Sequence, residues 1–329
     1  MINLLGNCKT LGIVGLAKNT GKTTTLNYLI KNYQHLILGL TSIGLDGEEF
    51  DQVNFLPKPR IKVFPGMILA TSTECLEHTD VSFHLIKETS FQTALGKVCI
   101  VKALTEGLIM LAGPTTNREL NQLIKMMKPY VEMIFVDGAL SRMTFSAISE
   151  LDGIVLATGA AFSEEMVETV LKTKHIIKTF SYELTQKKIN DQSSIYIECE
   201  DGYISMNHKK YDEIKAILKQ TKDKVKWLYI KGAITEKMIQ MFIELRINHV
   251  ELVIDDPAKL LFHHNYASVF DKLNMNVTVR QKCPLVLITV NPFRPIGKSY
   301  NPFLFETEIK ALTNINVINV KHMEVNNGK

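Results

Sequence analysis

The chain has 329 residues, of which 46% are hydrophobic and 22% are charged, and its mean hydropathy is +0.04. This composition is ordinary for a globular protein and too polar for an integral membrane protein. The 38 Lys and Arg and the 34 Asp and Glu residues are scattered, without the basic runs typical of nucleic-acid binding. We therefore expect no nucleic-acid and no membrane partner. The length favours two domains, since one domain usually takes about 100–200 residues.

The five cysteines are isolated, odd in number and never in a Cys-x-x-Cys arrangement: Cys8, Cys75, Cys99, Cys199 and Cys283. This pattern predicts neither a disulfide framework nor a zinc site, and it fits a reducing compartment. The first nine residues lack the basic start, apolar stretch and cleavage site of a signal peptide. We therefore expect a cytoplasmic protein.

In the first half of the chain, short apolar runs alternate with longer segments of helical period. This alternation is typical of a parallel sheet with crossover helices. The predicted strands are Thr10–Gly15, His35–Thr41, Leu108–Ala112, Met133–Asp137 and Gly153–Thr158. The predicted helices are Lys22–Asn32, Val81–Gly96, Glu119–Met127 and Glu164–Lys172.

The alternation loosens around Phe180–Asp191, and a hairpin of Ile195–Cys199 and Tyr203–Met206 is predicted after it. The later strands are predicted at Lys226–Lys231, His249–Ile254, Asn276–Arg280, Pro284–Val290 and Asn316–Val320, and the later helical segments at Thr235–Leu245 and Pro257–Leu273. The predicted fold class is α/β. A domain with a mainly parallel sheet flanked by helices is expected at 1–190, and a smaller α/β domain that could bind a partner at 191–329.

Residues 15–23 follow the pattern G-x-x-x-x-G-K-[ST], between a predicted strand and a predicted helix. In this setting the backbone N–H groups of the loop and the start of the helix form a cradle for phosphate, which predicts a P-loop NTPase. The residues expected to bind nucleotide are Gly15, Lys18, Asn19, Thr20, Gly21, Lys22, Thr23 and Thr24. Lys22 should reach the β- and γ-phosphates, and Thr23 the Mg²⁺ ion. A glycine-containing turn that merely starts a helix is the alternative.

Lys18 has two interpretations. In some dimerising P-loop ATPases a second lysine, five positions before the main one, reaches the nucleotide of the other subunit. Here the interval from Lys18 to Lys22 is four. The spacing therefore favours a solvated loop lysine, with a trans-acting Lys18 in a homodimer as the alternative.

Three carboxylates are candidates for the metal and the attacking water. Asp137 ends the apolar run Met133–Val136, so we expect it to hold Mg²⁺ together with Thr23 if its strand lies beside Leu11–Gly15. A surface-turn aspartate is the alternative. Asp46 and Glu48 follow the second predicted strand and could orient water, although Asp46-Gly47 is equally compatible with an acidic turn. The predicted catalytic residues are Lys22, Asp46, Glu48 and Asp137.

The expected cofactors are ATP and Mg²⁺. The sequence contains no Asn-Lys-x-Asp element of the kind that selects guanine, and the small residues Gly159-Ala160-Ala161 permit close backbone approach. Both observations favour adenine.

Several segments together resemble the KamB-type reactivase subunits that are associated with adenosylcobalamin-dependent lysine or ornithine aminomutases. They are residues 15–27, Thr41–Gly44, Asp46–Glu48, Leu56–Ile61 and Val136–Ala139, with a looser match at Ile288–Pro292. The resemblance implies a P-loop ATPase that helps to release inactivated cobalamin from the mutase, with the mutase and a second reactivase subunit as partners. The Asp-x-His-x-x-Gly pattern of a cobalamin lower-ligand site is absent from the sequence.

Two other functions fit the phosphate loop. One is a small-molecule kinase or an ATP-dependent ligase resembling dethiobiotin synthetase, with the second half as a substrate domain. The other is a nucleotide sensor that binds without hydrolysis. Product formed from a small acceptor would favour the first, and tight binding without turnover would favour the second.

Overall fold

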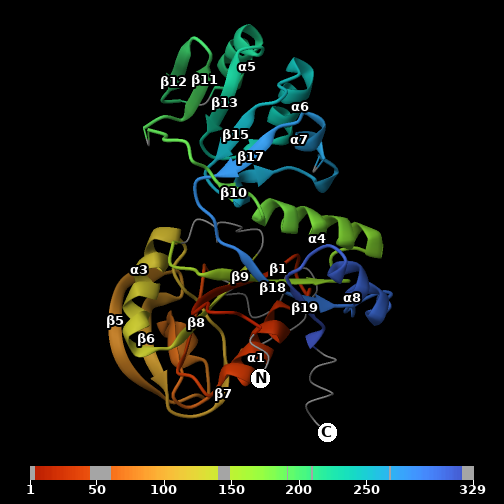
Figure 1. Cartoon of the computed structure of the whole chain (residues 1–329). Coiled ribbons are helices and arrows are strands. Elements are labelled where there is room, and N and C mark those ends of the chain that lie inside the picture. The colour runs from red at the N-terminus through yellow and green to blue at the C-terminus, as the bar shows by residue number, and fades with distance from the viewer. Residues whose placement is uncertain are drawn as a thin grey trace. The chain divides into compact units, whose positions relative to one another are not determined.

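The computed structural model describes residues 4–44, 61–139, 149–190, 192–208, 210–266 and 268–320. The chain divides into two compact units (Figure 1). Unit 1 comprises Met1–Thr173 and Cys283–Lys329, and unit 2 comprises Lys174–Lys282. Unit 2 is therefore inserted into the sequence of unit 1.

Unit 1 is built on a nine-stranded sheet in the order β19-β18-β9-β1-β8-β2-β4-β6-β5. Its strands are β1 (Thr10–Gly15), β2 (Leu38–Ser42), β4 (Ile68–Ser72), β5 (Phe83–Thr93), β6 (Gly96–Ala103), β8 (Met133–Ala139), β9 (Gly153–Gly159), β18 (Leu285–Asn291) and β19 (Asn316–Ile318). All neighbours from β19 to β4 are parallel. The fold class is thus mixed α/β with a large, mostly parallel sheet, as predicted.

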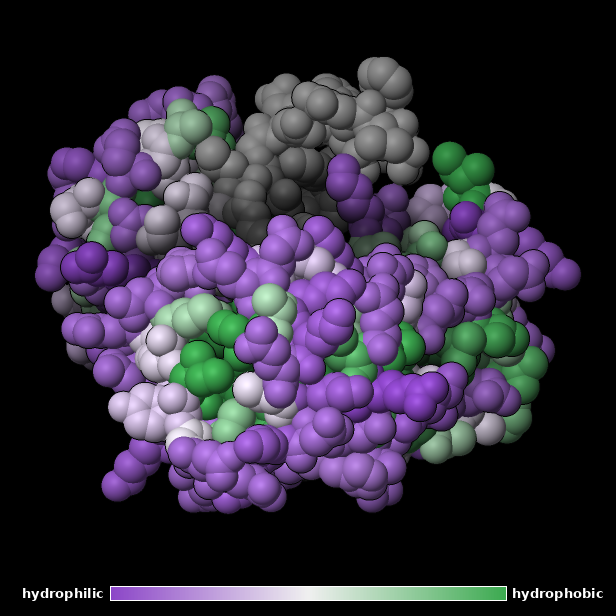
Figure 2. Space-filling model, turned by 90° about the horizontal axis from the view of Figure 1, so that it is seen from above, coloured by the Kyte–Doolittle hydropathy of each residue, from purple (hydrophilic) through white to green (hydrophobic). Residues whose placement is uncertain are grey.

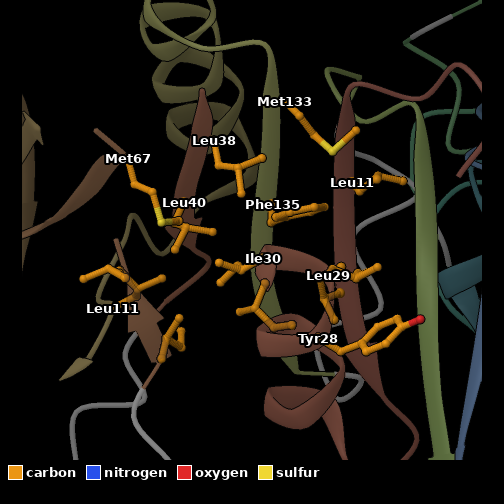
Figure 3. Close-up of a cluster of buried hydrophobic side chains, with 14 of the residues drawn as sticks. Leu11, Tyr28, Leu29, Ile30, Leu38, Leu40, Met67, Leu111, Met133 and Phe135 are labelled. Carbon is orange, nitrogen blue, oxygen red and sulfur yellow. The ribbon is translucent and has the colours of Figure 1, made fainter. Parts of the chain in front are cut away.

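Helices lie on both faces of this sheet. They are α1 (Lys22–Tyr33), α2 (Thr73–Glu77), α3 (Asn117–Met127), α4 (Met166–Phe180), which continues into unit 2, and α8 (Pro302–Lys310). Leu29 and Ile30 of α1 pack with Leu11, Leu40 and Phe135 in one buried cluster (Figure 3). The Met127 side chain of α3 lies against Gly39 instead, whose neighbours in β2 face the α1 cluster. Since side chains alternate along a strand, α3 covers the opposite face.

The antiparallel arm β4-β6-β5 was not predicted, and the helix predicted at Val81–Gly96 is wrong. Most of that segment is β5, which pairs with β6. Buried Thr89, Phe91 and Thr93 alternate with exposed residues, which is the period of a strand. A further small sheet pairs β3 (Ile61–Val63) with β7 (Gly107–Ile109). The strand predicted at Leu108–Ala112 therefore begins at Gly107 and ends at Ile109 in the structure.

Unit 2 has a six-stranded sheet in the order β10-β17-β15-β13-β11-β12. The strands are β10 (Glu183–Leu184), β11 (Ile195–Cys199), β12 (Gly202–Met206), β13 (Val225–Ile230), β15 (Glu251–Ile254) and β17 (Asn276–Val279), and the helices are α5 (Tyr211–Thr221), α6 (Glu236–Leu245) and α7 (Val269–Lys272). The predicted hairpin is present as β11 and β12. The helix predicted at Pro257–Leu273 is largely wrong: two 3₁₀ turns, the short strand β16 (Leu260–Leu261), which pairs with β14 (Ile234–Thr235), and α7 occupy it.

The division into units differs from the boundary predicted near residue 190. The chain enters unit 2 within α4, and β18 and β19 return to the sheet of unit 1 after it. The physical reason is pairing: β18 forms a parallel ladder with β9, a strand that precedes it by more than a hundred residues in the sequence. A local sequence pattern does not show that a later strand pairs with the sheet of an earlier unit.

In the part of the chain that the structure describes, none of the helices is long and apolar enough to cross a membrane. Figure 2 shows one face of the molecule, on which hydrophobic side chains form separate patches among hydrophilic ones.

Candidate nucleotide-binding site

The segments that sequence analysis assigned to a nucleotide site meet at one edge of the unit 1 sheet. Gly15, the last residue of β1, lies opposite Ala139 of β8 and Ala157 of β9. Asp137 of β8 lies opposite Ile13 of β1 and Ser42 of β2. Because these strands are parallel, their carboxyl ends share one edge, which is where open α/β sheets bind ligands.

The loop between β1 and α1 is held by its own backbone and by β9. The Leu16 N–H donates to the Ala157 carbonyl at 2.8 Å, and the Thr20 hydroxyl donates to the Ala17 carbonyl at 2.8 Å. Gly21 precedes α1 with a φ of 96°, a conformation that favours glycine. The first N–H groups of a helix have no partner within it, so the start of α1 offers donors to an anion.

Lys22 and Asp137 are brought together from positions 115 residues apart. The Lys22 Nζ atom lies 3.1 Å from Asp137 Oδ2, and the side chains are only 19% and 16% exposed. The condition set by the sequence analysis, that the strand of Asp137 lies beside Leu11–Gly15, is met by the β1–β8 ladder. The pair places a cation and a carboxylate directly at the start of α1.

The other predicted residues occupy different parts of the loop. Thr23 and Thr24 are half-buried in the first turn of α1, and Thr20 is buried beneath the loop. Lys18 and Asn19 are exposed, and Asn19 has a left-handed backbone with a φ of 62°. Asp46 and Glu48 lie outside the described residues.

The residues just before the segment of Asp46 and Glu48 lie against Asp137. The Ile43 N–H donates to the Asp137 carbonyl at 3.0 Å, and the Gly44 N–H donates to the Pro114 carbonyl at 2.7 Å. The Gly113 N–H donates to Ser42 Oγ at 2.9 Å. The segment Gly113-Pro114 thus holds Ser42 and Gly44 in place. The sequence did not predict this contact, although it shows a Gly-Pro pair before a predicted helix.

Asn291 lies beside the loop of residues 15–23, a position that the sequence did not predict. It ends β18, its Nδ2 lies 3.5 Å from the Asn19 carbonyl, and its own carbonyl accepts from the Ala160 N–H at 2.9 Å. A Cβ atom on Gly159 would lie 2.5 Å from the Asn291 carbonyl oxygen and 3.2 Å from that of Thr20. Glycine at 159 is therefore required for β9, β18 and the phosphate loop to approach each other.

The chain that follows Asn291 is anchored by Tyr300. The Tyr300 N–H donates to the Pro292 carbonyl at 2.9 Å, and its hydroxyl lies 2.6 Å from the Ser163 carbonyl and 2.8 Å from Thr169 Oγ1. Burial is the main reason that the pKa of Tyr300 is raised above its ordinary value. The hydroxyl therefore stays protonated and continues to donate at neutral pH.

The donors at this edge fit a magnesium ion that arrives with phosphate. Among the described residues, no three His, Cys, Asp or Glu side chains are grouped to hold a metal. Mg²⁺ usually keeps several waters and binds through one or two carboxylates together with substrate phosphates. The Asp137 carboxylate and the Thr23 hydroxyl are donors of the required kind.

The comparisons with family models, curated proteins and solved structures find no match for this chain.

Proposed function

We propose that this protein binds ATP with Mg²⁺ in the loop Gly15–Thr23 and hydrolyses it. The observation that carries the proposal is the approach of Lys22 to Asp137 at 3.1 Å, at the carboxyl edge of a parallel sheet and at the start of a helix. A cation and the N–H groups of a helix N-terminus stabilise phosphate charge, and a carboxylate holds the metal.

The proposed roles follow from the chemistry of each group. Lys22 and the backbone N–H groups of the loop bind the phosphates, and Thr23 and Asp137 hold the cation. When bound, Mg²⁺ would neutralise negative charge that develops on the phosphates. Asp46 or Glu48 orients the attacking water, which is a proposal from the sequence alone. The absence of a guanine-selecting element from the sequence supports adenine as the base.

The proposed cellular role rests on the resemblance to reactivase subunits. In that role the partners are an adenosylcobalamin-dependent aminomutase and a second reactivase subunit, and hydrolysis drives the release of inactivated cofactor. Nucleotide can act on the mutase only if the ATP-bound and ADP-bound forms of this protein bind it with different affinities. Two described parts contact this site: the segment Ser42–Gly44, whose Ile43 N–H donates to the Asp137 carbonyl, and Asn291, whose Nδ2 lies 3.5 Å from the Asn19 carbonyl. We propose that they change with the bound nucleotide.

The test is release of phosphate from ATP and Mg²⁺ by the purified protein, alone and with the mutase added. Wild-type protein should hydrolyse ATP, and Lys22→Ala should abolish turnover while the folded structure is retained. Lys97→Ala is the matched control, because it removes a lysine that pairs with Glu88 on the distant β5–β6 hairpin. Equal turnover by Lys22→Ala and wild type would overturn the site assignment. Phosphate transferred to a small acceptor would replace hydrolysis by a kinase or ligase activity.

A further inference from the structure

We propose that β12, an edge strand of unit 2, is a dimer surface that pairs antiparallel with β12 of a second copy of this chain. The proposal goes beyond the nucleotide site, which belongs to unit 1. It rests on the composition of the strand, on a stack of aromatic rings that ends at it, and on the charges before and after it.

The strand β12 (Gly202–Met206) is an exposed template for another strand. It lies at the end of the six-stranded sheet, and in the described part of the chain β11 is its one neighbour (Figure 1). An edge strand presents unpaired backbone N–H and C=O groups, and proteins usually protect it with charges, proline, bulges or short length. The sequence Gly-Tyr-Ile-Ser-Met contains neither a charge nor a proline, and its register with β11 is unbroken.

The other edge strands of the two large sheets are protected. β10 and β19 have only two and three residues. β5 is longer, but its pairing with β6 shifts register twice, and exposed Lys87 and Glu88 lie between its buried residues and its start. Among the described edges of these sheets, β12 is therefore the one that combines regular pairing with an uncharged sequence.

A stack of three aromatic rings ends on β12. The ring centres of Trp227 and Tyr196 are 4.8 Å apart, and those of Tyr196 and Tyr203 are 5.3 Å apart, with interplanar angles of 16° and 8°. Trp227 is buried, whereas Tyr203 is 67% exposed. An aromatic ring is a large apolar surface, and its burial contributes strongly to association. A strand added beside β12 would cover the exposed ring of Tyr203.

Pairing of the whole strand with its own copy sets one register. Ile204 then lies opposite Ile204 of the second copy, and Tyr203 lies opposite Ser205 of the second copy. Tyr203 and Ser205 are on the same face, because side chains alternate along a strand. In an antiparallel pair, aromatic side chains reach both the opposite residue and its diagonal neighbour. Each Tyr203 ring would therefore contact Ser205 and Tyr203 of the second copy.

The charges at the two ends of β12 favour this antiparallel arrangement. Exposed Glu200 and Asp201 precede the strand, and exposed His208 and Lys210 follow it. Antiparallel pairing brings the acidic end of one copy next to the basic end of the other. Parallel pairing would bring like charges together, which is unfavourable. The sequence of the strand and its flanks is thus complementary to itself.

Three of these side chains also have a partner in their own chain. Asp201 pairs with Lys224 at 2.6 Å, Lys210 lies 3.1 Å from Glu213, and His208 contacts Glu213 as well. All these side chains are exposed, and exposed ion pairs contribute little to stability because water screens them. The charges can therefore also interact with those of a second copy.

The experiment follows the molar mass of the full chain by sedimentation equilibrium, from about 1 to about 300 μM protein. Wild type should shift from monomer to dimer over this range, because five residues a side are far fewer than the roughly 20–30 a side of a stable interface. Tyr203→Lys should raise the dissociation constant at least about tenfold, since a lysine on an edge strand opposes pairing. Tyr130→Lys is the matched control, because Tyr130 is an exposed tyrosine of unit 1 and should leave dimerisation unchanged.

Charge reversal tests the antiparallel arrangement separately. Glu200→Lys and Lys210→Glu should each weaken the dimer, because each variant brings like charges together. An equimolar mixture of the two variants should associate more tightly than either alone, since opposite charges meet again at both ends. Trp227 fluorescence establishes that unit 2 of each variant is folded.

The inference is overturned if wild type stays monomeric at the highest concentration, which would assign the edge to a strand of another protein. It is also overturned if a dimer forms that folded Tyr203→Lys does not weaken, because the copies then meet elsewhere. If mixing the two charge variants does not restore association, antiparallel pairing of β12 is wrong. None of these results depends on ATP binding, so the proposed function stands or fails independently.

Discussion

Two charged residues of unit 1, Asp137 and Glu150, are held in place by strand pairing or by ion pairs. At the carboxyl edge, the β1–β8 and β2–β8 ladders fix Asp137 beside Lys22. Near the start of β9, Glu150 accepts from Lys128 at 2.6 Å and lies 3.5 Å from Lys125, with only 15% of its side chain exposed. Glu150 thus ties the chain before β9 to the end of α3, which precedes the strand of Asp137.

The Glu150 cluster predicts a pH dependence of stability. Hydrogen bonding to Lys128 is the main reason that the pKa of Glu150 is lowered. A lowered carboxylate pKa gives stability that is present above its unfolded value of about 4.3 and is lost as the pH falls through the lowered value. Glu150→Gln should therefore reduce the free energy of unfolding by about 0.5–1 kcal/mol at pH 7. Urea denaturation should show this difference shrinking as the pH falls through the lowered pKa of Glu150, and a difference that is constant across pH would contradict it.

At the scale of elements, α1 holds the end of the loop that follows β1, because the buried face of this helix is tightly packed. Leu26, Leu29 and Ile30 are fully buried in one cluster with residues of β1, β2 and β8. Figure 3 shows Leu29 and Ile30 in this cluster. The strand before the loop is also buried at every residue. The loop is thus held at both ends by buried elements. This arrangement explains how a glycine-containing segment can present its N–H groups in fixed directions.

Leu29→Ala tests this packing. Truncating a fully buried leucine costs about 2–5 kcal/mol through lost burial and the cavity left behind. We expect a loss of that size in the unfolding of unit 1, measured by circular dichroism in urea, and weaker ATP binding because the start of α1 loosens. Leu85→Ala is the control, since Leu85 is 51% exposed on the edge strand β5 and its truncation should cost less than about 0.5 kcal/mol. Equal losses for the two variants would contradict the packing account.

The elements also show what the sequence could and could not predict. β1, β8 and β9 are short apolar runs bounded by turn residues, so they were found almost residue for residue. β5 was mistaken for a helix because its polar and apolar residues follow neither period cleanly before Thr89. The sequence predicted that Asp137 ends a strand beside Leu11–Gly15, and the β1–β8 ladder confirms this position. The contact between Lys22 and Asp137 was not predicted.

The remaining site residues depend on contacts that no local pattern encodes. Asn291 reaches the phosphate loop because β18 pairs with β9, and that pairing is made by a strand that follows the whole of unit 2. In the sequence, Asn291 belongs only to the looser match at Ile288–Pro292, and no local pattern places it beside residues 15–23. Likewise, Gly113 and Pro114 contribute to this edge of the sheet only through their hydrogen bonds with Ser42 and Gly44, which lie about 70 residues away in the sequence.

At the scale of the whole molecule, each unit has its own buried core. The core of unit 2 includes Phe242 and Ile239 of α6 and Leu228 of β13, and all three are fully buried. The single tryptophan of the chain, Trp227, also lies in unit 2, where it is 8% exposed and stacks on Tyr196 with ring centres 4.8 Å apart. Its fluorescence therefore reports on the folding of unit 2.

The substitution Phe242→Ala tests whether the two cores are independent of each other. It should reduce the stability of unit 2, followed by Trp227 fluorescence in urea, by about 3–5 kcal/mol. ATP affinity should remain within about twofold of wild type, because Phe242 belongs to the core of unit 2 and the proposed site to unit 1, and sites with no shared partners usually act independently. Leu29→Ala is the reciprocal variant and should weaken ATP binding while leaving the Trp227 transition in place. Loss of ATP binding in folded Phe242→Ala would show that the site in unit 1 needs the core of unit 2.

The most direct test of the account is calorimetric binding of ATP in excess Mg²⁺ to wild type and to Lys22→Ala, because it depends on neither turnover nor a partner. We predict that wild type binds and that Lys22→Ala binds about tenfold to 100-fold more weakly, the equivalent of about 1.5–3 kcal/mol for hydrogen bonds to charged phosphate. Lys97→Ala should bind like wild type. Absence of binding by folded wild-type protein, or equal affinity of wild type and Lys22→Ala, would contradict the assignment of Gly15–Thr23 as the nucleotide site.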